Sequence, residues 1–254
     1  MALRTRTLIA SAGVVLLGLG LTGCGSTDPG DAPAEHKSFA LRGKTLTIHS
    51  GDSSLELAPA DVQKVEVTRR VDGWVALGNG PEPEWEMRDD TLRLEVKCRA
   101  LVSDCAAQHQ VKVPRGVAVV VEGDDGKVVA SGFHSALTLH ADNGRVIVRD
   151  SSGPLGLESD NGDIFTEGVS AKSVSARSDN GRIRLGFASV PDLVDTVSDN
   201  GEITIELPAG SVKYAVDAVA EEGRVSVDAP RSDDSGHVVK ARSDNGQVTV
   251  RSAN

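Results

Sequence analysis

The residues with the clearest chemical potential in this chain are aspartates that recur at a regular spacing. Each stands first in an Asp-Asn-Gly triplet, and altered copies occur at Asp124-Asp125-Gly126 and Glu221-Glu222-Gly223. Stacked carboxylates could bind Ca²⁺, which takes several oxygen ligands. The chain lacks the Gly-Gly-x-Gly-x-Asp form of calcium-binding repeats, however, and Asp before Asn-Gly is also favourable turn chemistry. The sequence therefore predicts no metal or cofactor, with calcium as the weaker alternative. The complete triplets are Asp142-Asn143-Gly144, Asp160-Asn161-Gly162, Asp179-Asn180-Gly181, Asp199-Asn200-Gly201 and Asp244-Asn245-Gly246.

Catalytic patterns are missing from the sequence. The six histidines are scattered, without a His-Glu-x-x-His helix or a spacing suited to zinc. No Gly-x-Ser-x-Gly motif occurs, and no glycine-rich loop precedes a helical segment. Some parallel β-helices are polysaccharide lyases or hydrolases, but the repeats here are too short to build the deep clefts of those enzymes. The sequence therefore predicts that the protein is not an enzyme, with a glycan-active β-helix as the third hypothesis.

The N-terminal residues resemble a signal for secretion. Arg4 and Arg6 precede an apolar run over 8–21, which is typical of a secretory signal peptide and short for a membrane span. The following Leu21-Thr22-Gly23-Cys24 resembles the bacterial lipobox. That resemblance implies cleavage after residue 23, a diacylglyceryl thioether on Cys24 and, in many bacteria, N-acylation. We therefore expect a signal peptide at 1–23, and a lipidated Cys24 with a flexible tether at 24–38 that holds the protein outside the bacterial cell membrane.

The charge balance limits the partners. The chain has 27 basic and 37 acidic residues, for a net charge of −10. Because the basic residues form no cluster and do not alternate with aromatic residues, the sequence argues against nucleic-acid binding. An acidic chain also argues against tight docking onto anionic lipid.

The cysteines left after lipidation form an even pair. Cys98 and Cys105 are predicted to form a disulfide, since an extracytoplasmic location is oxidising. The alternative is a two-cysteine metal site, for which His109 is the only histidine nearby in the sequence.

The elements that position these residues follow from the repeat. Its glycines are separated by 18, 18, 19, 20, 22 and 23 residues. When the copies are aligned on this glycine, the columns seven and five before it, and two and four after it, are mostly apolar. This period of two on both sides of the turn predicts two half-buried strands in each copy. Asn and Gly tolerate positive φ, so the dipeptide is expected to adopt positive φ and bend the chain tightly.

Two architectures fit this pattern: a parallel β-solenoid of about seven coils, and an antiparallel β-meander of hairpins. All length variation falls in the connection opposite the Asn-Gly turn, as it does when inserts loop out from one side of a solenoid. Only 3% of residues are aromatic, which suits a small core between paired strands. We therefore predict an all-β parallel solenoid over 116–254, with the meander as the alternative. Stacked asparagines are expected to form a hydrogen-bonded ladder.

Residues 39–115 are predicted to form a β-rich N-terminal cap that contains one degenerate coil, with Ser53 in the glycine column. Trp74 and Trp85 flank a Gly/Pro segment there and are expected either to seal the end of the stack or to bind a partner. In the first regular coils, Ile147 and Phe165 stand in an outward column that is apolar. These four residues form the predicted partner surface.

The repeated Asp-Asn-Gly-x-Ile/Val-x-Val/Leu phrase, following Val113-Pro114-Arg115-Gly116, resembles the bacterial β-strand-repeat family described as "putative adhesins". The resemblance covers about 39–254 and implies a fold, lipid anchoring or membrane tethering in many members, and no known active site. The resulting hypothesis is an adhesion or envelope-binding scaffold that contacts a cell-envelope polymer. The alternative is an accessory or sensory module that docks an envelope protein.

Overall fold

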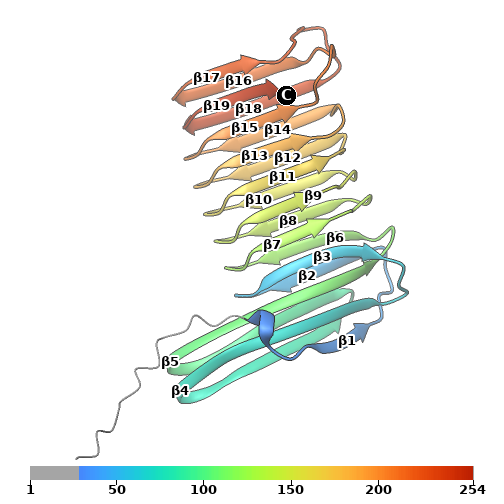
Figure 1. Ribbon diagram of the computed structural model, residues 1–254, viewed down its shortest axis with the longest axis vertical. Helices are drawn as coiled ribbons and strands as arrows, with labels where there is room; N and C mark the ends of the chain where they lie inside the picture. The colour runs from blue at the N-terminus through green and yellow to red at the C-terminus, as the bar shows by residue number, and fades with distance from the viewer. Residues whose placement is uncertain (1–28, 254) are drawn as a thin grey trace, which may run out of the picture.

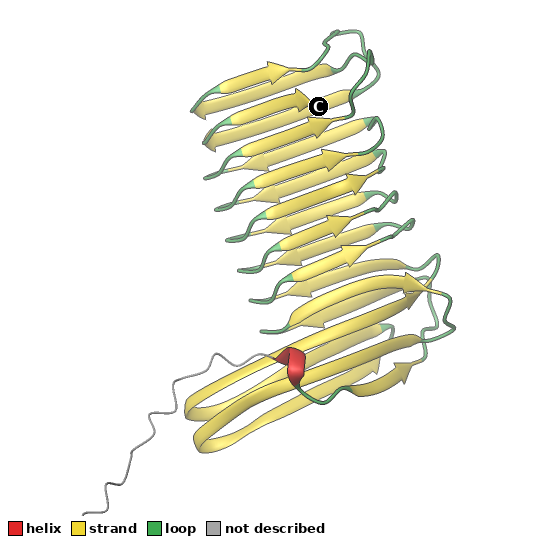
Figure 2. Cartoon of the chain, viewed as in Figure 1, coloured by secondary structure: helices red, strands yellow, loops and turns green. Residues whose placement is uncertain are grey.

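The computed structural model describes residues 29–253. The predicted signal peptide, Cys24 and the first part of the tether lie outside the described residues. The described chain is nearly all strand and forms a stacked solenoid with two flat faces (Figures 1 and 2). In this part of the chain, no helix has the length and apolar character needed to cross a membrane.

The two faces consist of alternate strands, preceded by a short 3₁₀ helix, η1 (Pro29–Asp31), and by an N-terminal cap. The cap contains β1 (Glu35–Phe39), β4 (Val65–Arg88) and β5 (Thr91–Pro114). The first face contains β2 (Thr45–Ser50), β6 (Ala118–Gly123), β8 (Leu137–Ala141), β10 (Leu155–Ser159), β12 (Ser173–Ser178), β14 (Leu193–Ser198), β16 (Ala215–Glu222) and β18 (Val238–Asn245). The second face contains β3 (Ser54–Ala60), β7 (Val128–Ser131), β9 (Val146–Arg149), β11 (Ile164–Val169), β13 (Ile183–Phe187), β15 (Ile203–Leu207), β17 (Val225–Asp228) and β19 (Val248–Ser252).

Strand pairing within both faces is parallel, which confirms the solenoid and excludes the meander for the repeats. The four apolar columns point into the narrow space between the faces. In the central coils their side chains are at most 5% exposed, as Val174, Ile183 and Leu185 illustrate. In the coil at the far end of the stack, Val225 is 44% exposed because no coil covers it.

The spatial order of the coils differs from the chain order at both ends. The last coil in the sequence, β18–β19, lies between β14–β15 and β16–β17 (Figure 1). At the other end, β2–β3 lies between β6–β7 and β5, whose first and last parts pair with β2 and β3 respectively. Simple stacking in sequence order therefore holds only from β6–β7 to β14–β15.

The glycine of each triplet is required for a different reason from the one expected. None of these glycines, and none of the preceding asparagines, has a positive φ, so that part of the prediction is wrong. Instead, a Cβ on Gly162 would lie 1.9 Å from the carbonyl oxygen of Gly144, and one on Gly181 would lie 2.1 Å from that of Gly162. Consecutive turns thus stack backbone on backbone, and only glycine permits this approach.

Side-chain ladders connect the turns along the stack. Asn161 donates to Asn143 at 2.8 Å, and Asn180 donates to Asn161 at 3.0 Å, so the expected asparagine ladder is confirmed. A second, buried ladder was not predicted: Ser159 donates through Oγ to the carbonyl of Gly144 at 3.0 Å and accepts from the backbone N–H of Gly162 at 2.9 Å. Each turn therefore satisfies its polar groups through its neighbour. Later members are Asn200, Asn245, Ser178, Ser198 and Ser243.

The N-terminal cap is an antiparallel ribbon of β4 and β5 that folds over the end of the stack, with β1 on its outer edge (Figure 1). Cys98 and Cys105 form the predicted disulfide across the bend of β5, with Cα atoms 6.6 Å apart. The η1 helix contacts both long strands, so the described chain begins at this end of the solenoid.

Aromatic and charged side chains fill the cap. Trp85 packs edge-on against Phe39, with ring centroids 6.3 Å apart, and the Arg69 guanidinium lies 3.9 Å from the Trp85 ring. Arg69 also pairs with Glu35. On the neighbouring strand, His109 is fully buried, with Nδ1 3.1 Å from Ser53 Oγ. Burial, followed by the charge of Arg69, lowers the pKa of His109 to about 4.

His109 should make the stability of this protein depend on pH. The unfolded chain binds a proton at this histidine below about pH 6.5, whereas the folded chain does so only near pH 4. The contribution of neutral His109 to the free energy of unfolding is therefore complete above pH 6.5. It falls by about 3 kcal/mol as the pH drops to 4. We expect a smaller loss in His109→Gln, measured as urea midpoints at several pH values. Parallel pH profiles for the parent and the variant would contradict this assignment.

Candidate functional site

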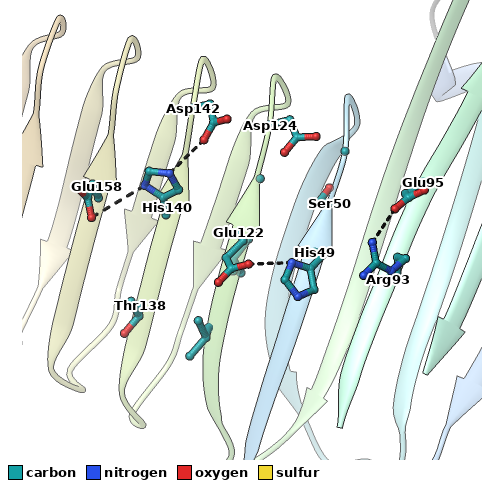
Figure 3. A pocket seen from close by; sticks show the side chains of 14 residues that line it. His49, Ser50, Arg93, Glu95, Glu122, Asp124, Thr138, His140, Asp142 and Glu158 are labelled. Carbon is teal, nitrogen blue, oxygen red and sulfur yellow. Dashed lines mark hydrogen bonds and ion pairs between the residues drawn. The ribbon is translucent and has the colours of Figure 1, made fainter. Parts of the chain in front are cut away.

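An alternating row of histidine and glutamate crosses the outer surface of the first face. His49 on β2, Glu122 on β6, His140 on β8 and Glu158 on β10 are aligned by the parallel register (Figure 3). All occupy the column four residues before the glycine position, and their side chains point outward because the flanking residues of each strand point inward. The next member of this column is Arg177 on β12.

The histidines of this row contact carboxylates. His49 Nδ1 lies 2.8 Å from Glu122 Oε2. His140 lies between two acids: Nε2 donates to Asp142 Oδ1 at 3.0 Å, and Nδ1 lies 3.9 Å from Glu158 Oε2 (Figure 3). These groups hold the imidazole of His140 between neighbouring coils.

The row forms one wall of an open groove of about 590 Å³. At its turn side, burial raises the pKa of Asp124, and the nearby carboxylates, Asp142 foremost, raise it further. A hydrogen bond from Arg93 lowers the pKa of Glu95. Because five carboxylates and one arginine line the groove, the local potential is negative, which suits a cation or a hydroxyl-rich ligand. The groove is lined by His49, Ser50, Gly51, Arg93, Glu95, Val120, Val121, Glu122, Gly123, Asp124, Thr138, His140, Asp142 and Glu158.

Within this region, His140, Asp142 and Asp160 each place one ligand atom within 4.8 Å of the others. The two aspartates were singled out from the sequence as first residues of their triplets, whereas the histidine was not. This cluster is assembled across two coils, so no zinc motif along the chain announces it. The available signal is the column four residues before the glycine position, which alternates between His and Glu. Asp142 and Asp160 begin an acidic row of triplet aspartates along the stack. The row continues with Asp179, Asp199 and Asp244.

A second groove lies on the outer surface of the opposite face, with a volume of about 480 Å³. It contains Ile147 and Phe165, two of the predicted partner residues, with Arg145 5.4 Å from the Phe165 ring centroid. Arg149 and Arg184 also line it, and both pair with glutamates. This surface combines apolar, aromatic and charged groups, a composition found in binding surfaces.

The structure separates the four predicted partner residues. Trp85 packs in the cap, as described above, whereas Trp74 is 53% exposed on the bend of the ribbon. Leu77 and Val102 are exposed on the same bend. Ile147 and Phe165 lie on β9 and β11, in the body of the solenoid. The prediction thus combined two distinct surfaces and one packed side chain.

Comparison with known proteins supports the architecture. A "putative adhesin" from Parabacteroides distasonis is 13% identical, covers 87% of this chain and 98% of its own, and superposes with a TM-score of 0.50. A "putative adhesin" from Bacteroides fragilis is 15% identical, with coverages of 87% and 97% and a TM-score of 0.49. At this identity the first similarity shows the fold alone. No curated protein matches the chain.

The family assignment follows from the extent of a separate match. The model of the Toastrack DUF4097 family, a domain of unknown function, matches residues 36–254. This range includes the cap, all coils and both grooves, as the resemblance noted in the sequence implies. The chain therefore belongs to the Toastrack DUF4097 family.

Proposed function

We propose that this protein is a non-catalytic, lipid-anchored rod that binds a polymer or a protein of the bacterial cell envelope. The observation that carries the proposal is the form of its surfaces: two open grooves lie on the outer faces of the stack. Long repetitive faces suit extended ligands, since each coil adds an equivalent contact. Envelope adhesion is the first candidate, and it agrees with the description of the Parabacteroides distasonis relative as a "putative adhesin".

Anchoring at Cys24 would orient the rod. Only four residues separate Cys24 from η1, which contacts β4 and β5. Four or five extended residues span less than about 20 Å. The lipid would therefore hold the cap near the membrane and present the coils from β6 to β17 outward. The proposed location is the outer face of the cell membrane.

The anchoring proposal predicts a clear fractionation result. The unaltered protein should incorporate labelled palmitate and sediment with membranes, whereas Cys24→Ala should incorporate none. The variant should be recovered among soluble extracytoplasmic proteins or remain attached through an uncleaved signal peptide. Equal labelling of both proteins would contradict lipidation at Cys24.

The binding proposal is tested with the mature chain carrying Cys24→Ser, immobilised and exposed to envelope extract from its own cell. Retained polymer supports adhesion, whereas one stoichiometric protein supports the accessory-module alternative, for which the apolar part of the second groove is the favoured contact. Phe165→Ser should then reduce retention, and Val219→Ser, exposed on β16 at the far end of the stack and outside both grooves, serves as the matched control. Recovery of no ligand from self or from other cells would contradict binding, and polysaccharide cleavage would support the enzymatic hypothesis.

A further inference from the structure

We propose that His140, Asp142 and Asp160 form a binding site for a divalent transition metal ion, with Zn²⁺ as the best fit. This inference goes beyond the binding function above and does not depend on it. One imidazole nitrogen and two carboxylate oxygens are the donor types that zinc accepts. An imidazole donor disfavours Ca²⁺ and Mg²⁺, which bind mainly through oxygen.

The distances require the donor atoms to move together. Zinc binds nitrogen and oxygen at about 2.0–2.2 Å in tetrahedral geometry, so two ligands of one ion lie about 3.4 Å apart. The three donor atoms now lie within 4.8 Å of one another, and His140 Nε2 is 3.0 Å from Asp142 Oδ1. Because His140 and Asp160 are only partly buried and Asp142 is exposed, side-chain rotation can supply the difference without moving the strands.

The second ring nitrogen of His140, Nδ1, gives an independent reason to expect metal binding at Nε2. Among the described side chains, His140 Nδ1 is one of four buried polar atoms without a hydrogen-bond partner, and Glu158 Oε2 lies 3.9 Å away. Histidines that bind metal through one nitrogen usually direct the other N–H toward a carboxylate or carbonyl. When metal binds Nε2, the neutral imidazole carries its one proton on Nδ1, the nitrogen that faces Glu158. Glu158 is therefore assigned as a positioning residue.

The surrounding charges favour a cation. Glu122 and Asp124 on the preceding coil extend the negative wall of the groove, and Arg177 is the first basic residue of the same column. The three ligands come from β8, from the turn after it and from the turn after β10, so bound metal would connect two adjacent coils. Three protein ligands leave at least one coordination position for water or an anionic group of a partner.

Titration calorimetry of the mature Cys24→Ser protein without a polyhistidine tag tests the site directly. We expect one Zn²⁺ per chain, and a loss of affinity of about tenfold or more in His140→Ala, His140→Gln and Asp160→Asn. His134→Ala is the matched control because His134 precedes the same strand and is bonded to Ser152, outside the acidic groove. Zn²⁺ should also raise the melting temperature of the parent but not of His140→Gln.

Three results would overturn the proposal. They are no Zn²⁺ binding at about 1 mM, the weak limit for a specific site; equal Zn²⁺ affinity in the parent and both His140 variants; and Ca²⁺ binding with the same affinity as Zn²⁺. The last result would indicate a site made of carboxylates alone. Circular dichroism of each variant, compared with the parent, confirms that a lost affinity is not a lost fold.

Discussion

Substituting alanine for Gly162 is expected to destabilise the solenoid by about 3 kcal/mol, at the upper end of the usual cost of overpacking. The added Cβ would lie 1.9 Å from the Gly144 carbonyl oxygen and 2.7 Å from Ser159 Oγ. Neither neighbour can retreat easily, because one is backbone and the other is held in the serine ladder. The two turns must separate, which weakens the hydrogen bond between Asn161 and Asn143 as well.

The matched control is Gly156→Ala, one strand earlier in the same coil. Its Cβ would find Thr138 at 3.7 Å, an ordinary van der Waals contact, and its φ is not positive. Alanine there should be neutral or slightly stabilising, since it restricts the unfolded chain. Urea unfolding followed by circular dichroism compares the two variants. Equal midpoints for both would show that the turns do not need glycine for close stacking.

Ile183→Asp is expected to abolish the folded state of the central coils. The side chain is fully buried on β13, between Ile164 on one side and Ile203 on the other. An unpaired carboxylate in this apolar column costs about 5 kcal/mol or more, comparable with the whole stability of many domains. Because each coil is stabilised by its neighbours, the defect should spread along the stack.

Two controls separate charge from position. Ser173→Asp places the same charge on the exposed start of β12, and Ile183→Val removes one methylene from the core. The first should change the urea midpoint little, and the second should cost about 1 kcal/mol. Circular dichroism and hydrogen exchange of β11–β15 provide the readout. If Ile183→Asp melts with the parent, the inward assignment of this column is wrong.

The regular coils could be predicted from the sequence because the signal is redundant. Four columns are apolar in nearly every copy of the repeat. Because side chains alternate between the two faces of a strand on both sides of the turn, only one face of each strand can point into the core. The interleaved ends could not be predicted. Val216 and Val239 occupy the same column, so either strand satisfies the inward pattern beside Val194. The local pattern shows which side chains of a coil are buried, but it does not show which other coil lies next to that coil in the stack.

The candidate site was predictable in part. The acidic row follows from the triplets, and the His–Glu alternation is visible once the outward columns are aligned. The sequence pattern does not show side-chain geometry. His140 lies close to Asp142 on its own coil and to Asp160 on the next coil. Local preference predicts a positive φ at Asn-Gly, but these residues do not have one. Glycine is required there because the backbones of consecutive turns approach closely, which is a tertiary effect.

The displaced position of β18–β19 has a consequence for the order in which the protein can fold. A chain that is synthesised from its N-terminus releases β16–β17 before the coil that must separate it from β14–β15. In a simple repeat stack, each new coil can dock as it emerges. Here the outermost coil must wait, or must give up a premature contact, until β18–β19 has been synthesised. Insertion of β18–β19 therefore completes the stack, and β16–β17 reaches its final position only after that step.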